Sequence, residues 1–222
     1  MASLEERRRR RKVYFERRAR WTRHIIGREE SSEFYDTHYT IDQSNSDATY
    51  SRQPCETSYY PSWKQVLVWI KDDERIADFG CGPGQFAQLA LETGKRYVLG
   101  VDFSRVAVEW AQRRNPSIAS RFFVGDILSE KVHALEDYDV AVFLETLEHI
   151  HEDLEALRLV PRGRRVILTV PSFSLEVHVR FFRTMKEVIR RYRSVLEITR
   201  TAFVDLSVYR RLWLVEGIRS DS

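Results

Sequence analysis

The chain has 222 residues, which allows one domain of ordinary size with an appendage. Hydrophobic residues make up 43% of it and aromatic residues 12%, and its apolar runs are far shorter than the ~20 residues that span a bilayer, so a disordered chain and a membrane-embedded one are excluded. Two cysteines, Cys55 and Cys81, are too few for a disulfide framework or a cysteine-based zinc site. With no secretory signal visible, we expect a cytoplasmic protein without membrane insertion.

The net charge of +3 hides an uneven distribution along the chain. Residues 1–23 carry +7, residues 24–150 carry −9 and residues 151–222 carry +5. The arginine block from Arg7 to Arg11 is typical of a solvated helical arm. The alternative is a contact with phosphate on nucleic acid, on a nucleotide-linked substrate or on an anionic surface.

Two segments precede the expected core. Residues 1–28 form a basic arm with a helical pattern, and residues 29–62 mix Ser, Asn, Asp and Pro with several tyrosines. We interpret residues 29–62 as an irregular lid or cap, because they are too aromatic for a simple linker. The tyrosines concerned are Tyr35, Tyr39, Tyr50, Tyr59 and Tyr60.

From Arg75 onward, short apolar runs alternate with helical patterns, which is typical of a parallel sheet covered by helices on both faces. The expected strands are residues 75–79, 97–101, 121–124, 139–144 and 166–170, with two more at 195–201 and 208–216. The expected helices are residues 63–70, 85–93, 105–114, 153–159 and 184–193. Their caps are Ser104, Gly94 and the capping box of Thr184 with Glu187. This alternation of strand and helix patterns therefore predicts that residues 63–222 form one α/β domain.

A glycine-rich turn links the first strand to the following helix, with the sequence Asp78-Phe-Gly80-Cys-Gly82-Pro-Gly84. Glycines there let the backbone approach a ligand closely, and the helix offers free N–H groups. A dinucleotide fingerprint needs glycine where Gln85 stands, so a pyrophosphate site is not predicted.

Acidic residues also end the next two strands. Asp102 follows the second strand and can accept hydrogen bonds from ribose hydroxyls. Asp126 and Ile127 follow the third strand, where the carboxylate suits the adenine amine and Ile127 offers an apolar surface. Because parallel strands end at the same edge of the sheet, these residues predict an adenosine pocket.

The four segments that close the first four strands resemble, in order and spacing, the motifs of the Rossmann-like, class I S-adenosylmethionine-dependent methyltransferases. The resemblance covers residues 63–216, and its pattern is most similar to the ubiquinone-pathway methyltransferases. The four motifs are residues 78–84, 101–103, 125–127 and 137–144.

This resemblance implies a doubly wound, seven-stranded, mostly parallel sheet with an antiparallel last strand. It implies S-adenosylmethionine as cofactor and S-adenosylhomocysteine as product. The implied binding residues are Asp78, Gly80, Gly82 and Gly84 in the turn, Asp102 at the ribose, Phe103 and Ile127 at the adenine faces, Asp126 at its amine and Leu144 near the sulfur.

Two carboxylates and an imidazole follow the fourth strand, at Glu145, Glu148 and His149. If this segment is helical, they share one face beside the donor sulfur. The carboxylates could simply orient His149, or His149 could act as a general base whose basicity the carboxylates raise. In the third interpretation Glu145, Glu148 and His149, with His178, bind Mg²⁺ or Mn²⁺.

The Glu-x-x-Glu-His pattern resembles both the ubiquinone-pathway enzymes and the small-RNA terminal-ribose methyltransferases, in which these residues are associated with metal. The surroundings of His178 resemble small-molecule members more than the RNA enzymes. His178 could equally be a packing residue, and His151 is expected to face solvent. The basic residues from Arg180 to Arg193 are expected to form a solvated face, part of which could meet an anionic acceptor.

We therefore expect a methyltransferase that acts on an oxygen or nitrogen of a small, anionic metabolite, with His149, Glu145 and His178 as the catalytic candidates. The first alternative is a metal-assisted RNA ribose methyltransferase that uses the basic arm. The second is a non-catalytic scaffold that binds S-adenosylmethionine.

Overall fold

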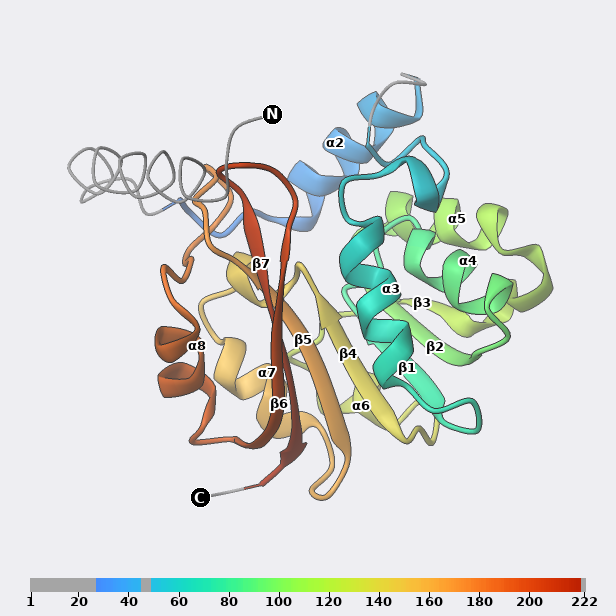
Figure 1. Ribbon diagram of the computed structural model, residues 1–222. Coiled ribbons are helices and arrows are strands. Elements are labelled where there is room, and N and C mark those ends of the chain that lie inside the picture. Colours follow the sequence, from blue (N-terminus) through green and yellow to red (C-terminus); the bar gives the residue numbers. More distant parts are fainter. Residues whose placement is uncertain (1–26, 45–48, 221–222) are drawn as a thin grey trace.

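The computed structural model describes residues 27–44 and 49–220, which form a seven-stranded sheet with helices on both faces (Figure 1). Almost all of the expected basic arm therefore lies outside the described residues. The strands are β1 (Arg75–Phe79), β2 (Arg96–Asp102), β3 (Phe122–Val124), β4 (Val140–Leu144), β5 (Arg165–Pro171), β6 (Leu196–Asp205) and β7 (Arg211–Arg219). The α-helices are α2 (Ser32–Gln43), α3 (Tyr60–Trp69), α4 (Gln85–Glu92), α5 (Arg105–Arg114), α6 (Glu130–His133), α7 (Asp153–Leu159) and α8 (Met185–Tyr192).

The strand order is β3-β2-β1-β4-β5-β7-β6, and it confirms the expected topology. Strands β1 to β5 are parallel to their neighbours in the sheet. β7 is antiparallel to both β5 and β6, so the last two strands form the expected hairpin. The order reverses between β1 and β4, which is where open parallel sheets bind ligands, outside the carboxyl ends of the strands.

The predicted helix caps are present. Ser104 accepts a hydrogen bond from the Ala107 N–H at the start of α5, and Thr184 and Glu187 form a reciprocal capping box at α8. Gly94, after α4, has a φ of 76°, a conformation that favours glycine. Local sequence therefore sets the boundaries of these elements.

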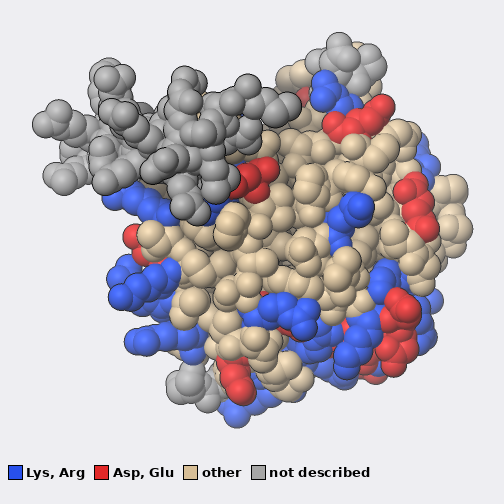
Figure 2. Space-filling view, viewed as in Figure 1, with Lys and Arg blue, Asp and Glu red and all other residues tan. Residues whose placement is uncertain are grey.

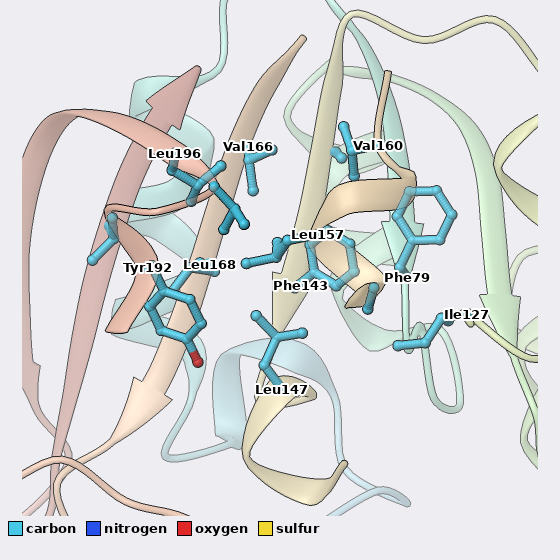
Figure 3. Packing of buried hydrophobic residues seen from close by; sticks show 14 of the residues in the cluster. Phe79, Ile127, Phe143, Leu147, Leu157, Val160, Val166, Leu168, Tyr192 and Leu196 are labelled. Atoms are coloured by element: carbon cyan, nitrogen blue, oxygen red, sulfur yellow. The ribbon is translucent and has the colours of Figure 1, made fainter. Parts of the chain in front are cut away.

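Two hydrophobic clusters fill the spaces on either side of the sheet. Figure 3 shows the cluster in which Phe79, Phe143 and Leu168 of the sheet pack with Leu157 of α7 and Tyr192 of α8. The opposite cluster joins the other face to α3, α4 and α5. Strands buried on both faces hold their carboxyl ends in fixed positions, which is what a ligand site at that edge requires.

The expectation that residues 29–62 are irregular is wrong for part of the segment, since residues 32–43 form α2 and α3 already begins at Tyr60. Ser31 accepts a hydrogen bond from the Phe34 N–H and caps α2. Tyr39 is its only buried residue, so the apolar repeat that reveals a helix in a sequence is too weak here. Among the described residues, no helix has the length and apolar character needed to cross a membrane.

Asp78 lies at the end of β1 with its carboxyl group buried, and Tyr97 of β2 donates a hydrogen bond to it over 3.0 Å. Burial raises the pKa of Asp78 to about 7, because the loss of water outweighs the hydrogen bond from Tyr97. The group is therefore largely protonated just below neutral pH.

Replacing Asp78 by Asn should make the protein less sensitive to pH. Between about pH 4 and pH 7 the folded wild type retains a proton that its unfolded chain releases, so this group lowers stability as the pH rises, by at most on the order of 4 kcal/mol. In urea unfolding, the free energy of unfolding of D78N minus that of the wild type should grow over this range and then level off. A difference that stays constant with pH would contradict the raised pKa.

Candidate active site

A cavity of about 400 Å³ opens at the carboxyl ends of the strands and under α2. Its lining includes nearly all of the site residues expected from the sequence: Asp78, Gly80, Gly82, Asp102, Phe103, Asp126, Ile127, Leu144, Glu145, Glu148, His149 and His178. The exception is Gly84, which has a φ of 74° and lies against α5, where an added Cβ would be 2.7 Å from the Asn115 side chain. Gly84 thus shapes the turn by packing against α5 and does not line the cavity.

The glycine turn is held by the neighbouring strand. The Gly80 N–H donates to the Val101 carbonyl over 2.8 Å, and the Gly82 N–H donates to the Asp102 carboxylate over 2.9 Å. Gly82 has a φ of 50°, and a Cβ there would meet only the Tyr39 hydroxyl, at 3.6 Å. The backbone at Gly82 is therefore bare toward the cavity, as a close approach to a ligand requires.

Asp102 is the buried carboxylate at the end of β2. One oxygen accepts the Gly82 N–H, and the other accepts the Ser104 N–H over 2.9 Å. Burial raises the pKa of Asp102 to about 6, while these two hydrogen bonds favour its ionised form. The carboxylate is thus fixed in orientation, and each oxygen retains a lone pair for a hydroxyl group.

The third strand contributes the far wall of the cavity. Asp126 is exposed, and its carboxylate accepts the Leu128 N–H over 2.8 Å. Ile127 is buried, and its carbonyl lies 2.8 Å from Nε2 of His133, which stacks on Phe79. Phe103 also lines the cavity and is 39% exposed, so its ring is accessible to a planar group.

The segment after β4 is not the helix that the sequence analysis considered for Glu145, Glu148 and His149. Glu145 has a φ of 56°, and only a single turn of 3₁₀ helix follows, at Leu147–His149. Glu145 is the only residue other than glycine with positive φ in the described ranges, and its N–H donates to the Thr169 hydroxyl over 2.9 Å. This strained turn still directs Glu145 and Glu148 into the cavity.

Glu148, His149 and His178 come together as a compact group, with one potential metal-ligand atom from each lying within 4.8 Å of the others. The rings of the two histidines are 4.9 Å apart. Nδ1 of His149 lies 3.0 Å from the Val177 carbonyl, and Nδ1 of His178 lies 3.2 Å from the Phe173 carbonyl. An Nδ1–H that donates to a carbonyl leaves Nε2 as a free acceptor on each ring. Glu145 lines the same cavity outside this group of three.

The buried carboxylates have no hydrogen-bond partners for several of their oxygens. Both oxygens of Glu148 and one of Glu145 are buried and unpaired in the described part of the chain. Burial raises the pKa of Glu145 to about 8, and burial with the nearby Glu145 charge raises the pKa of Glu148 well above its ordinary value. Unpaired buried carboxylates beside two neutral imidazoles fit a divalent cation, which would supply the missing charge.

The expectation that neighbouring carboxylates raise the basicity of His149 is wrong. Burial lowers the pKa of His149 to about 4 and that of His178 to about 3. Desolvation is the larger effect at His149, and the hydrogen bond to the Val177 carbonyl offsets only part of it. Both imidazoles are therefore neutral, the form that ligates metals.

Helix α2 supplies site residues to which the sequence analysis gave no individual role. The Tyr35 hydroxyl lies 3.0 Å from Nδ1 of His149, and its ring lies 5.3 Å from that of Phe103. Asp36 accepts a hydrogen bond from the Ser104 hydroxyl over 2.5 Å at the start of α5. After α2, the chain is held by Gln85 of α4, which donates hydrogen bonds to the carbonyls of Thr49 and Arg52. The aromatic content of residues 29–62 was the available signal, but it did not indicate which tyrosine reaches His149.

Residues 76–166, less than half of the chain, match a family of proteins described as "Methyltransferase domain". Ribosomal protein L11 methyltransferase from Shewanella baltica (strain OS195) is 36% identical over 77 residues, which are 33% of this chain and 25% of that protein. The chain thus matches about a quarter of the length of this curated relative.

Solved structures with similar folds extend the likeness beyond this segment. Magnesium protoporphyrin IX methyltransferase from Synechocystis PCC 6803 with bound S-adenosylmethionine has a TM-score of 0.55 at 21% identity and covers 99% of this chain and 100% of its own. N-methyltransferase NodS from Bradyrhizobium japonicum WM9, in complex with S-adenosylhomocysteine, has a TM-score of 0.62 at 16% identity and covers 83% and 98%. Residues 76–166 therefore match a methyltransferase domain, and the chain shares the Rossmann-like fold of these methyltransferase structures.

Proposed function

We propose that the protein transfers the methyl group of S-adenosylmethionine to an oxygen or nitrogen of a small-molecule acceptor, with a divalent cation at Glu148, His149 and His178. The observation that carries this proposal is the unpaired, buried carboxylate of Glu148 beside two neutral histidines, in the same cavity as the Asp102 carboxylate. A cavity with both features can hold a nucleoside cofactor and an acceptor together.

The cofactor side of the proposal rests on the glycine turn and on Asp102. The bare backbone at Gly82 and the oriented carboxylate of Asp102 fit the methionyl and ribose parts of the cofactor, and Phe103, Asp126 and Ile127 fit its adenine. S-Adenosylmethionine supplies a methyl group already activated on a sulfonium. The protein therefore has to orient the acceptor, exclude water and accept a proton where the acceptor loses one.

The acceptor side rests on Glu148, His149 and His178, with Glu145 nearby. A bound Mg²⁺ or Mn²⁺ supplies Lewis acidity that makes an acceptor hydroxyl easier to deprotonate. With pKa values this low, neither histidine is a strong base by itself, so the imidazoles hold the cation and orient the acceptor. Tyr35, Tyr59 and Trp63 line the cavity and exclude water from it.

The cavity lining also bears on the charge of the acceptor. Among residues 27–44 and 49–220, no Lys or Arg lines the cavity, whereas several carboxyl groups do. We therefore place the reacting hydroxyl or amine of the acceptor inside the cavity and any anionic group of the same molecule outside it. The charge distribution along the sequence is compatible with such a division, because the excess of Lys and Arg lies in residues 1–23 and 151–222.

An RNA acceptor is the second candidate, favoured by one surface feature. Figure 2 shows Lys and Arg side chains gathered at the edge of the molecule where Figure 1 places α8. Exposed members of this group include Arg183, Lys186 and Arg190, which follow His178 closely along the chain. A polyanion could lie along α8 with its end at the cavity.

Neutralising this surface separates the two acceptor classes. The triple variant R183A/K186A/R190A should retain RNA no differently from the wild type in filter binding at low salt if the acceptor is a small molecule. RNA retention by the wild type that falls at least about tenfold in the variant, and falls with salt, would favour the RNA acceptor. A third possibility, a scaffold without catalysis, is contradicted by any conversion of cofactor to S-adenosylhomocysteine that needs an acceptor.

The Asp102→Ala substitution should weaken S-adenosylhomocysteine binding at least about 100-fold, because it removes the ribose acceptor and the partner of the Gly82 N–H. Isothermal titration calorimetry measures the affinity, and circular dichroism checks that the variant folds. The exposed Asp73 provides a matched control, and D73A should bind like the wild type. Unchanged affinity in D102A would remove the proposed ribose contact.

Chelation by EDTA should reduce turnover of the acceptor at least about 100-fold, and Mn²⁺ or Mg²⁺ should restore it. Glu148→Gln keeps the shape of the side chain but removes its charge, so it should abolish Mn²⁺ binding measured by electron paramagnetic resonance. E155Q, at an exposed position on α7, serves as the control with wild-type binding. Full activity in EDTA would contradict the metal assignment and leave the cofactor assignment standing.

A further inference from the structure

Arg180 lies two residues after His178, and its side chain is only 16% exposed. The sequence analysis placed it in a solvated basic face, and for this residue that expectation is wrong. Its guanidinium points inward and donates hydrogen bonds to the carbonyls of Leu147 and Ile150, and to that of His151 over 2.9 Å. Arg180 thus contacts the loop that carries Glu148 and His149.

Two other contacts join the same pair of segments. The Val179 N–H donates to the Glu148 carbonyl over 2.8 Å, and Nδ1 of His149 lies 3.0 Å from the Val177 carbonyl. Residues 177–180, which include His178, therefore pack along the Glu148–His149 turn. The three carbonyls bound by Arg180 lie on both sides of that turn, so one rigid, planar group spans it.

The guanidinium is itself held by a buried acid. Asp153, at the start of α7, has a fully buried side chain that lies 3.2 Å from Arg180 and 2.6 Å from Arg191 of α8. A buried carboxylate between two guanidinium groups fixes their positions, because losing either partner leaves charge unpaired.

We propose that Arg180 is a positioning residue that holds Glu148 and His149 in register with His178 and so determines the affinity of the site for a divalent cation. The cation at these three residues is part of the proposed function, and this inference rests on it. Neither the guanidinium nor Asp153 lines the cavity, so Arg180 acts on the cation through the backbone of the turn.

The test compares Arg180→Ala and Arg180→Lys with Arg191→Ala as the matched control. R191A removes the other partner of Asp153 but leaves the carbonyl contacts of Arg180 intact. Mn²⁺ binding, followed by electron paramagnetic resonance, should weaken at least about tenfold in R180A and in R180K, because an ammonium group cannot reach the three carbonyls in one plane. The R191A substitution should change the affinity for Mn²⁺ less than about threefold.

Hydrogen exchange of the metal-free proteins gives a second readout that does not depend on the cation. Peptides covering residues 145–151 and 175–180 should both exchange faster in R180A than in the wild type and R191A. Wild-type exchange and wild-type Mn²⁺ affinity in R180A would overturn the inference. If R180A does not fold, R180K decides by the same criteria. If the wild type binds no Mn²⁺, the metal assignment falls, and exchange in the two peptides alone decides whether Arg180 holds the turn.

Discussion

Carboxyl groups buried at one edge of the sheet are the physical constraint on which the site depends. Asp102 is compensated by two backbone N–H groups, whereas the carboxylate of Glu148 has no hydrogen-bond partner within the described structure. A charged group without water or a partner is costly, so each carboxyl must be protonated or must meet a ligand that replaces the lost solvation. The proposed nucleoside at Asp102 and the proposed cation at Glu148 would each replace lost solvation, and binding either would relieve a cost of folding.

The fold provides this arrangement through rigid strand ends and a strained turn. β1, β2 and β4 are buried between two layers of helices, which hold their carboxyl ends in fixed positions. Glu145 leaves β4 with a positive φ, which turns the chain back and brings the next carboxylate over the cavity. Arg180, paired with Asp153, contacts the loop that carries Glu148 and His149 on the side away from the cavity lining. Helix α2 closes the opposite side, where Tyr35 meets His149 and Asp36 meets the start of α5.

Much of this architecture could be predicted because it depends on local patterns. The strands are apolar runs that end in Gly or Asp, and the caps at Ser104, Thr184 and Gly94 follow from side-chain and backbone chemistry within one turn. Helix α2 escaped prediction because it buries little, so it lacks an apolar repeat. Its position depends on contacts with Ser104 and His149, far away in the chain.

The amino-acid sequence by itself determined the parallel sheet, its strand order through the family pattern, and the set of acidic and glycine residues that line the cavity. Tertiary structure alone decided which of them meet. It brought His178 to Glu148 and His149, separated Glu145 from that group, lowered the pKa of His149 and turned Arg180 inward. The reason is physical: desolvation and pairing depend on every atom within a few ångströms, and most of those atoms belong to distant parts of the chain.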